Sequence, residues 1–186
     1  MEAFVPEVQK RRALRALDTR AVPGDAIERI LTAATWAPSC ANMQPWRFVV
    51  ASDEPTLGKV KESLSQGNYW AQKAPLIVAV LTRVDLDARL NDGRDYAFFD
   101  TGMASLALML QATREGLTAH PIAGFDPLVV KKNLGIPAEL TLLTLLIIGF
   151  PGAEDHLNDK HKEQEHGPRV RKDPAEVISR NRWFPG

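Results

Sequence analysis

The segment Pro38–Trp46 has the composition of a loop that binds a flat ligand. It reads Pro-Ser-Cys-Ala-Asn-Met-Gln-Pro-Trp. The two prolines fix the backbone path, the small residues let a ligand approach it, and the amides of Asn42 and Gln44 offer donors and acceptors. On local physics alone, an ordinary turn that ends a helix explains the same residues and is the commoner case. The segment therefore suggests a binding site without identifying its ligand.

Three arginines near the N-terminus, Arg11, Arg12 and Arg15, form a local basic cluster. The whole chain carries 23 basic and 23 acidic residues. With this balance no global field directs the protein to nucleic acid or to a membrane surface, so any anion site must be local. A solvated basic flank of a helix is the alternative interpretation of the cluster.

Other chemistries find little support. The single cysteine, Cys40, rules out an internal disulfide and a multi-thiolate metal site, and it suits a reducing cytosol. Three histidines, His156, His161 and His166, recur every fifth residue, a spacing that builds no metal-binding face, so we interpret them as a solvated loop. Cys40 could act as a nucleophile with His120 as its base, although a packing role for the thiol and a structural role for His120 are commoner.

The elements that must position these residues alternate along the chain, with more helix than strand. A helix is predicted over residues 7–18 and another from the start signal at residues 23–25 to the stop at Pro38. Further helices are predicted at residues 55–64, 96–114 and 127–134, and strands at residues 46–52, 76–81, 118–125 and 140–150. No dinucleotide fingerprint and no phosphate-binding P-loop is found.

Two stretches point to a second copy of the chain. The predicted helix 96–114 is apolar on nearly every side, which is more surface than one sheet of so small a domain is expected to cover. Residues 153–173 are mostly charged, yet Val177, Ile178, Trp183 and Phe184 need cover. We therefore expect a single domain over residues 1–186, with an arm over about 153–186 that docks on a partner subunit.

Four ordered segments resemble the nitroreductase family. The sequence RRALR at residues 11–15 precedes APSCANMQPWRFVV, in the order and at the spacing of that family. GLTAHPIAGFD resembles the family segment along the reactive edge of the flavin, and GPRVRKDPAEVI resembles its C-terminal element. With the terminal NRW, the resemblance covers residues 8–183.

The resemblance implies an FMN-dependent NAD(P)H oxidoreductase of class α+β, with a mixed four- or five-stranded sheet sandwiched by helices. It also implies an intertwined homodimer with two FMN sites at the interface. NAD(P)H would reduce flavin N5 and leave before a nitroaromatic, quinone or similar acceptor enters, a ping-pong cycle. Flavin N5 carries the chemistry, so no catalytic side chain and no metal are expected.

The resemblance also assigns site residues. The FMN phosphate is a near-dianion that guanidinium groups suit. The candidates for binding it are Arg11, Arg12, Arg15, Arg169 and Arg171; Arg11 and Arg171 would hold the phosphate and ribityl chain, and Arg15 would reach the N1 and O2 region. Pro38, Ser39 and Cys40 would pack on the ring from the neighbouring subunit, with Asn42 in the same pocket. Gln66 or Asn68 would bind the pyrimidine, and Pro121, Ile122, Ala123 and Gly124 would lie along the flavin.

The chain departs from the family pattern at Ala13, where many relatives have a serine, and at Ala123, where some have a glutamate. Reductive dehalogenation or oxidation of a small metabolite on the same fold remains an alternative, as does a non-catalytic, redox-sensing flavin dimer that uses Cys40. The N-terminus has no signal-peptide pattern and no run approaches membrane-spanning length, so we expect a cytoplasmic protein without a membrane or nucleic-acid partner.

Overall fold

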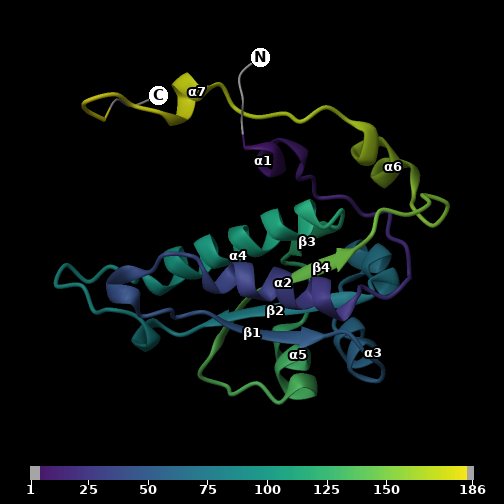
Figure 1. The fold of residues 1–186 in the computed structure, drawn as a ribbon, viewed down its shortest axis with the longest axis horizontal. Coiled ribbons are helices and arrows are strands. Elements are labelled where there is room, and N and C mark those ends of the chain that lie inside the picture. The colour runs from purple at the N-terminus through teal and green to yellow at the C-terminus, as the bar shows by residue number, and fades with distance from the viewer. Residues whose placement is uncertain (1–4, 184–186) are drawn as a thin grey trace.

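A four-stranded sheet forms the centre of the protein. The computed structural model describes residues 5–183, and its strands lie in the order β1-β2-β4-β3 (Figure 1). Their bounds are β1 Arg47–Ala51, β2 Leu76–Thr82, β3 Thr118–Ile122 and β4 Thr141–Gly149. All seven residues of β2 are buried, as the continuous apolar run predicted for a central strand.

Helices cover both faces of this sheet. The helices α2 (Gly24–Thr35) and α4 (Ala97–Arg114) pack on one face, and α3 (Thr56–Lys61) and α5 (Pro127–Leu134) pack on the other. Successive residues of β2 alternate between the two cores, because side chains of a strand point to opposite faces. The predicted α+β sandwich is confirmed. The expected mixture of strand directions is corrected, since all three strand pairs are antiparallel; apolar patterning does not encode direction.

Short helices connect these elements. The bounds of the 3-10 segments are η1 Cys40–Asn42, η2 Gln66–Lys73 and η3 Val84–Leu86. Helix α5 begins where the Asp126 carboxylate accepts from the backbone N–H groups of Leu128 and Val129, and it ends at Gly135, whose φ of 64° suits glycine.

The helix predicted over residues 7–18 is wrong beyond its first turn. Helix α1 spans only Pro6–Lys10, and the next residues run extended beside the edge strand β3. The side chains of Thr118 and His120 bond the carbonyls of Arg12 and Leu14, each at 3.1 Å. These contacts satisfy backbone groups that a helix would pair internally, so tertiary partners override the helical spacing.

A buried carboxylate completes the anchoring of this extended segment. Both oxygens of Glu165 accept backbone N–H groups, from Arg15 at 2.9 Å and from Ala16 at 3.2 Å. Glu165 lies on α6 (Asp159–His166), the first helix of the C-terminal arm. The arm is therefore fixed to its own subunit at α6 before it leaves the body.

Two of the three tail histidines are not solvated, so that interpretation is corrected. His161 stacks on Tyr69 with ring centroids 5.5 Å apart, and its Nδ1 lies 3.1 Å from the tyrosine hydroxyl. Both ring nitrogens of His156 are buried. Only His166 is exposed, where it lies 2.8 Å from Glu154. The charged composition of this stretch concealed how α6 docks on the body.

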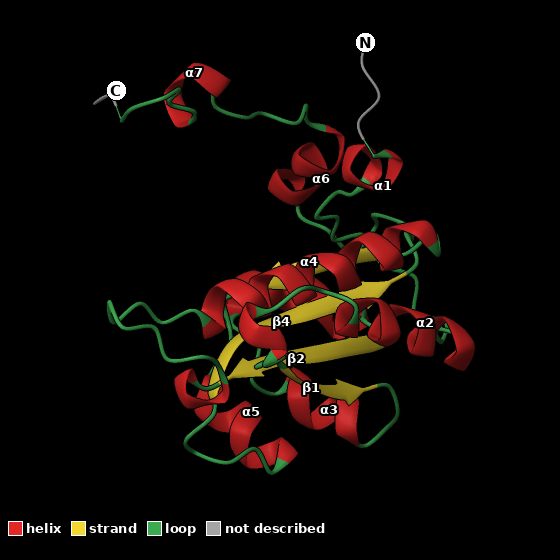
Figure 2. Ribbon diagram, turned by 60° about the vertical axis from the view of Figure 1, so that its left-hand side comes forward, coloured by secondary structure: helices red, strands yellow, loops and turns green. Residues whose placement is uncertain are grey.

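Beyond α6 the arm extends away from the rest of the chain (Figures 1 and 2). It carries α7 (Pro174–Val177), which buries none of its residues. The apolar side chains of Val177, Ile178 and Trp183 are exposed, Trp183 at 84%; Phe184 lies outside the described residues. Among residues 5–183, no helix has both the length and the apolar character needed to cross a bilayer.

Candidate functional site

Four of the predicted phosphate contacts line one small hollow. Its volume is about 190 Å³, and its walls come from both ends of the chain. The lining residues are Arg11, Arg12, Ala13, Pro168, Arg169, Val170 and Arg171. The extended segment after α1 and the arm after α6 thus bring together arginines that lie more than 150 positions apart in the sequence, as the separation of Arg12 from Gly167 shows.

Two of these arginines build the hollow. Arg12 Nη2 donates to the carbonyl of Gly167 at 2.8 Å. Arg169 donates to the carbonyls of Val8, Gln9 and Arg11, at 3.1 and 2.9 Å for the first two. Their guanidinium groups therefore fasten the arm to the N-terminal segment.

The other two, Arg11 and Arg171, keep charge available for a ligand. Within the described part of the chain, no carboxylate forms an ion pair with any of the four arginines. Partial burial lowers the pKa of Arg11, as do the positive charges of Arg169 and Arg171. Such concentrated, uncompensated positive charge favours an anion, and guanidinium forks match the geometry of phosphate.

Arg15 lies further along the extended segment, between this hollow and η2. Its guanidinium carbon is 6.0 Å from the ring centroid of Trp70, which contacts His120 with centroids 4.7 Å apart. The side chain forms no ion pair among residues 5–183. Arg15 therefore adds a further positive charge, beyond the four arginines of the hollow, next to η2.

His120 has a structural role, because its ring binds the extended segment through the carbonyl of Leu14. A carbonyl oxygen only accepts, so His120 Nδ1 carries the hydrogen that bonds Leu14. Burial is the main cause that lowers the pKa of His120, to about 4, and the charges of Arg15 and Arg11 add to it. The ring is thus neutral at pH 7, and the fold does not bring it to Cys40 within one chain.

Acid should therefore destabilise the fold through His120. The folded pKa of about 4 lies below the ordinary 6.5, so the unfolded chain binds the proton more readily and stability falls as pH drops through this window. At about 1.4 kcal/mol per unit, the loss approaches ~3.5 kcal/mol. We expect the free energy of unfolding in urea to fall less at acidic pH in His120→Asn than in the wild type. The amide N–H of the asparagine can replace Nδ1–H. The exposed His166→Gln is the control, and superimposable pH profiles for wild type and His120→Asn would contradict the assignment.

The predicted ring-facing residues meet where η2 contacts the end of β3. Asn68 Nδ2 donates to the carbonyl of Gly124 at 2.8 Å, and the Ser65 backbone N–H donates to the same oxygen at 3.0 Å. A Cβ at position 124 would lie 2.6 Å from both Asn68 Nδ2 and Ser65 Oγ, so a larger residue would displace these two side chains. The Asn68 Oδ1 atom remains an acceptor, whereas Gln66 is exposed. Pro121 and Ala123 are exposed on the edge strand and its end, with Ile122 buried between them.

The loop over Pro38–Asn42 lies elsewhere in the molecule. It sits at the N-terminal end of α4, where the backbone N–H of Cys40 donates to Asp100 Oδ2 at 2.7 Å. In Figure 1 this end lies at the left, whereas α1 and α6 lie above and to the right. A single chain therefore brings the arginines, Asn68 and Gly124 to one face, but it does not bring Pro38, Ser39, Cys40 and Asn42 to them.

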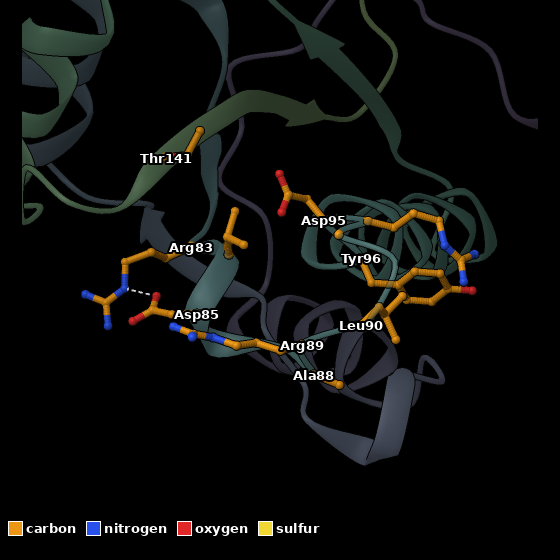
Figure 3. Close-up of a pocket in the computed structure, with 11 residues that line it drawn as sticks. Arg83, Asp85, Ala88, Arg89, Leu90, Asp95, Tyr96 and Thr141 are labelled. Carbon is orange, nitrogen blue, oxygen red and sulfur yellow. Dashed lines mark hydrogen bonds and ion pairs between the residues drawn. The ribbon is translucent and has the colours of Figure 1, made fainter.

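A hollow beside this loop adjoins a second hollow. The first, of about 390 Å³, is lined by Pro38, Ser39, Cys40, Leu90, Arg94, Tyr96, Phe99, Asp100 and Met103. The second, of about 510 Å³, is formed mainly by residues 83–96 and shares Leu90, Arg94 and Tyr96 with the first (Figure 3). Arg83 pairs with Asp85, as the dashed line in Figure 3 marks. The loop thus borders enough open space for a small aromatic molecule.

Sequence reasoning missed Asp100 and Glu165, the two buried carboxylates that anchor these segments. Asp100 is the single acidic residue within the apolar helix 97–114. A lone carboxylate in such a helix indicates a buried group with a specific partner, so the sequence contained a signal for it. Glu165 stands among many charged residues, and no pattern distinguishes it.

Comparisons with known proteins show the family to which the chain is similar. The model of the nitroreductase family matches residues 8–68 and 59–150. An NADH dehydrogenase from Thermus thermophilus is 28% identical over 192 residues, which cover 84% of this chain and 93% of that protein. Iodotyrosine deiodinase 1 from Mus musculus is 26% identical over 189 residues, covering 85% and 65% of the two chains.

A solved structure of similar fold extends the match to the whole chain. The crystal structure of an oxidoreductase containing FMN superimposes with a TM-score of 0.89 at 30% identity, covering 100% of this chain and 95% of that one. Because the family model matches well over half of the sequence and the fold agrees, the chain belongs to the nitroreductase family.

Proposed function

We propose that this oxidoreductase binds FMN and uses NAD(P)H, and that it works as a homodimer with a flavin site at each end of the interface. The observation that carries the proposal is the arginine hollow, in which Arg11 and Arg171 keep uncompensated charge. The FMN named for the similar crystal structure supports the choice of ligand.

The residues present suit each part of FMN. The phosphate would bind Arg11 and Arg171, while Arg12 and Arg169 hold the walls of the hollow. Arg15, further along the extended segment, would reach toward the pyrimidine edge. The acceptor oxygen of Asn68 would bind the same edge, and Gly124 lets the Asn68 side chain pack closely on the backbone there.

We propose the dimer because one chain does not bring all the predicted site residues together. Pro38, Ser39, Cys40 and Asn42 can cover a ring held by the arginine face only if they come from a second copy. Helix α4 exposes Phe98 and Phe99, and the arm exposes Ile178 and Trp183. We propose that the arm, about residues 153–186, docks its end on the partner and covers part of this apolar surface.

The protein's part in the reaction is binding and positioning. Bound FMN would supply the redox chemistry, taking a hydride from NAD(P)H and passing it to a nitroaromatic, quinone or similar acceptor in a ping-pong cycle. The arginines hold the cofactor, the loop shields one side, and Ala123 leaves the open side uncharged. No side chain of the chain has to donate or accept a proton in the hydride step.

One set of measurements tests this function. We expect the purified protein to show flavin absorption near 450 nm that NADH or NADPH bleaches without oxygen. Double-reciprocal plots at several acceptor concentrations should be parallel, because one open face cannot hold both substrates. Cys40→Ser should still be reduced, since hydride transfer uses no thiol. Absence of flavin, or flavin that neither nucleotide reduces, would contradict the proposal. Loss of flavin reduction in Cys40→Ser, with FMN still bound, would instead favour redox sensing through the thiol.

Reductive dehalogenation is the second candidate, because iodotyrosine deiodinase 1 is similar over 85% of this chain. Iodide release from an iodophenol and reduction of a nitroaromatic, assayed with the same reduced protein, separate the two activities. A markedly higher kcat/KM for the iodinated substrate would favour the dehalogenase.

A further inference from the structure

The carboxylate that anchors the Pro38–Asn42 loop does not stand alone in the fold. Asp100 is fully buried in the first turn of α4, and Asp87, just after η3, is 4% exposed. Asp100 Oδ2 accepts the backbone N–H of Cys40 at 2.7 Å, and Asp87 Oδ1 accepts the backbone N–H of Ala88 at 2.7 Å. Each carboxyl group thus uses one oxygen to bond a backbone N–H.

The remaining oxygens of the two groups lack partners. Asp87 Oδ2 and Asp100 Oδ1 are both buried, and neither bonds any donor among residues 5–183. Neither aspartate forms an ion pair with a described cation. Helix α4 packs against η3, the turn that Asp87 follows. Burial is the main cause that raises the pKa of Asp87, and the charge of Asp100 and a side-chain hydrogen bond with it add to this rise. Two ionised carboxylates in contact inside a protein repel each other strongly, and one shared proton removes the repulsion.

The loop needs such an anchor. Ala41, Asn42 and Gln44 have positive φ angles of 48°, 57° and 51°. Residues other than glycine pay about 1–2 kcal/mol for this conformation unless surrounding contacts enforce it. The other hydrogen bonds of residues 38–44, such as Gln44 N–H to Ser39 Oγ at 2.9 Å, remain within the loop and its flanks. In the described chain, the bond from Cys40 to Asp100 is the one that joins this turn to α4.

We propose that Asp87 and Asp100 share one proton and that this acid pair is the positioning device of the Pro38–Asn42 loop. Asp87 Oδ2–H donates to Asp100 Oδ1, which leaves Asp100 Oδ2 as the acceptor for Cys40. The pair acts through the loop and touches no substrate. Its consequence for FMN rests on the proposed function, whereas its effect on the loop does not.

The shared proton gives the anchor a pH dependence of known sign. A raised pKa means that the proton stabilises the folded loop at low pH and that this stabilisation is lost as pH rises through the folded value. The other titratable or charged side chains around the hollow are Cys40, Tyr96 and Arg94, and Arg94 is paired with Asp92 at 2.8 Å. The loop should therefore loosen as pH rises through the folded pKa of Asp87.

Cys40 provides a direct readout, because it is the single cysteine and lies in the loop. Its rate of reaction with dithiodipyridine, corrected for the thiolate fraction with the unfolded chain and compared at equal flavin content, reports loop opening. We expect Asp100→Ala to raise this rate about tenfold, as for loss of one charge-assisted hydrogen bond. Asp100→Asn should stay near the wild-type rate, because its oxygen can accept from Cys40 and its amide can donate to Asp87. The exposed Asp95→Ala is the matched control and should change nothing.

Asp87→Asn tests the proton itself. Its amide N–H replaces the shared proton, so the corrected rate should be independent of pH, whereas the wild-type rate should increase as pH rises through the folded pKa of Asp87. If Asp100→Ala does not fold, this comparison still decides the proposal. An unchanged rate in Asp100→Ala would overturn the anchor, and identical pH profiles for wild type and Asp87→Asn would overturn the shared proton. FMN affinity measured in the same variants should fall about tenfold only where the loop opens; a thiol effect without an FMN effect would leave the anchor standing and count against the proposed function.

Discussion

Truncation of the chain after Lys172 is expected to abolish both the dimer and stoichiometric FMN binding, while the sheet and its helices remain folded. The described part of the removed segment, up to residue 183, buries almost nothing in its own subunit: α7 has no buried residue, and Val177 and Trp183 are exposed. Arg11 and Arg171 stay in the truncated chain, so a loss of FMN would come from the missing partner. Because binding sites formed only in a complex disappear with it, the apparent affinity should drop more than about a hundredfold.

Sedimentation velocity, circular dichroism and FMN absorbance on the same samples measure the three properties. Trp183→Ala in the full chain should weaken the dimer less than truncation does. A truncated monomer that keeps one FMN per chain would show that the loop over Pro38–Asn42 is not required from a second copy.

Replacing either free arginine of the hollow should weaken FMN binding about ten- to hundredfold. Arg11→Ala or Arg171→Ala removes charge-assisted hydrogen bonds worth about 1.5–3 kcal/mol each. Their guanidinium groups form no ion pair among the described residues, so little of the fold depends on them. Arg20→Ala is the matched control, because Arg20 is exposed and 3.5 Å from Asp18.

Titration with FMN and with riboflavin makes this test sharper. Riboflavin keeps the ribityl chain but lacks the phosphate, so Arg11→Ala and Arg171→Ala should weaken its binding much less than that of FMN. A parallel loss of riboflavin binding would show that the substitutions damage the site as a whole and that the phosphate assignment is wrong.

The core elements could be predicted because their signals are local. The run Leu76–Leu81 is apolar without interruption, and residues 97–114 contain no turn-forming interruption, so burial and length determined the assignments. Four of the five arginines predicted for the phosphate line one hollow, although the helix assigned to the first of them was wrong. Positions 11 and 15 share one side both in a helix, where they are one turn apart, and in an extended segment, where alternate residues align.

Long-range pairing could not be predicted from the same signals. The bond from Cys40 to Asp100 joins residues 60 positions apart, and those from Arg15 and Ala16 to Glu165 join residues 150 and 149 positions apart. Periodicity describes one element at a time and contains no information on which carboxylate meets which backbone group. For the same reason the antiparallel pairing of β3 with β4 was not foreseen.

The extended course of residues 11–15 makes this face selective for ligand length. At about 3.3 Å per residue, the Cα atoms of Arg11 and Arg15 lie roughly 13 Å apart, against about 6 Å if the segment were helical. Thr118 and His120 hold the intervening carbonyls in register, so the spacing cannot relax without breaking both bonds. A ligand that offers its anionic end and its polar ring edge closer together than this spacing can satisfy only one of the two guanidinium groups. A single inserted residue between them would turn Arg11 to the opposite side.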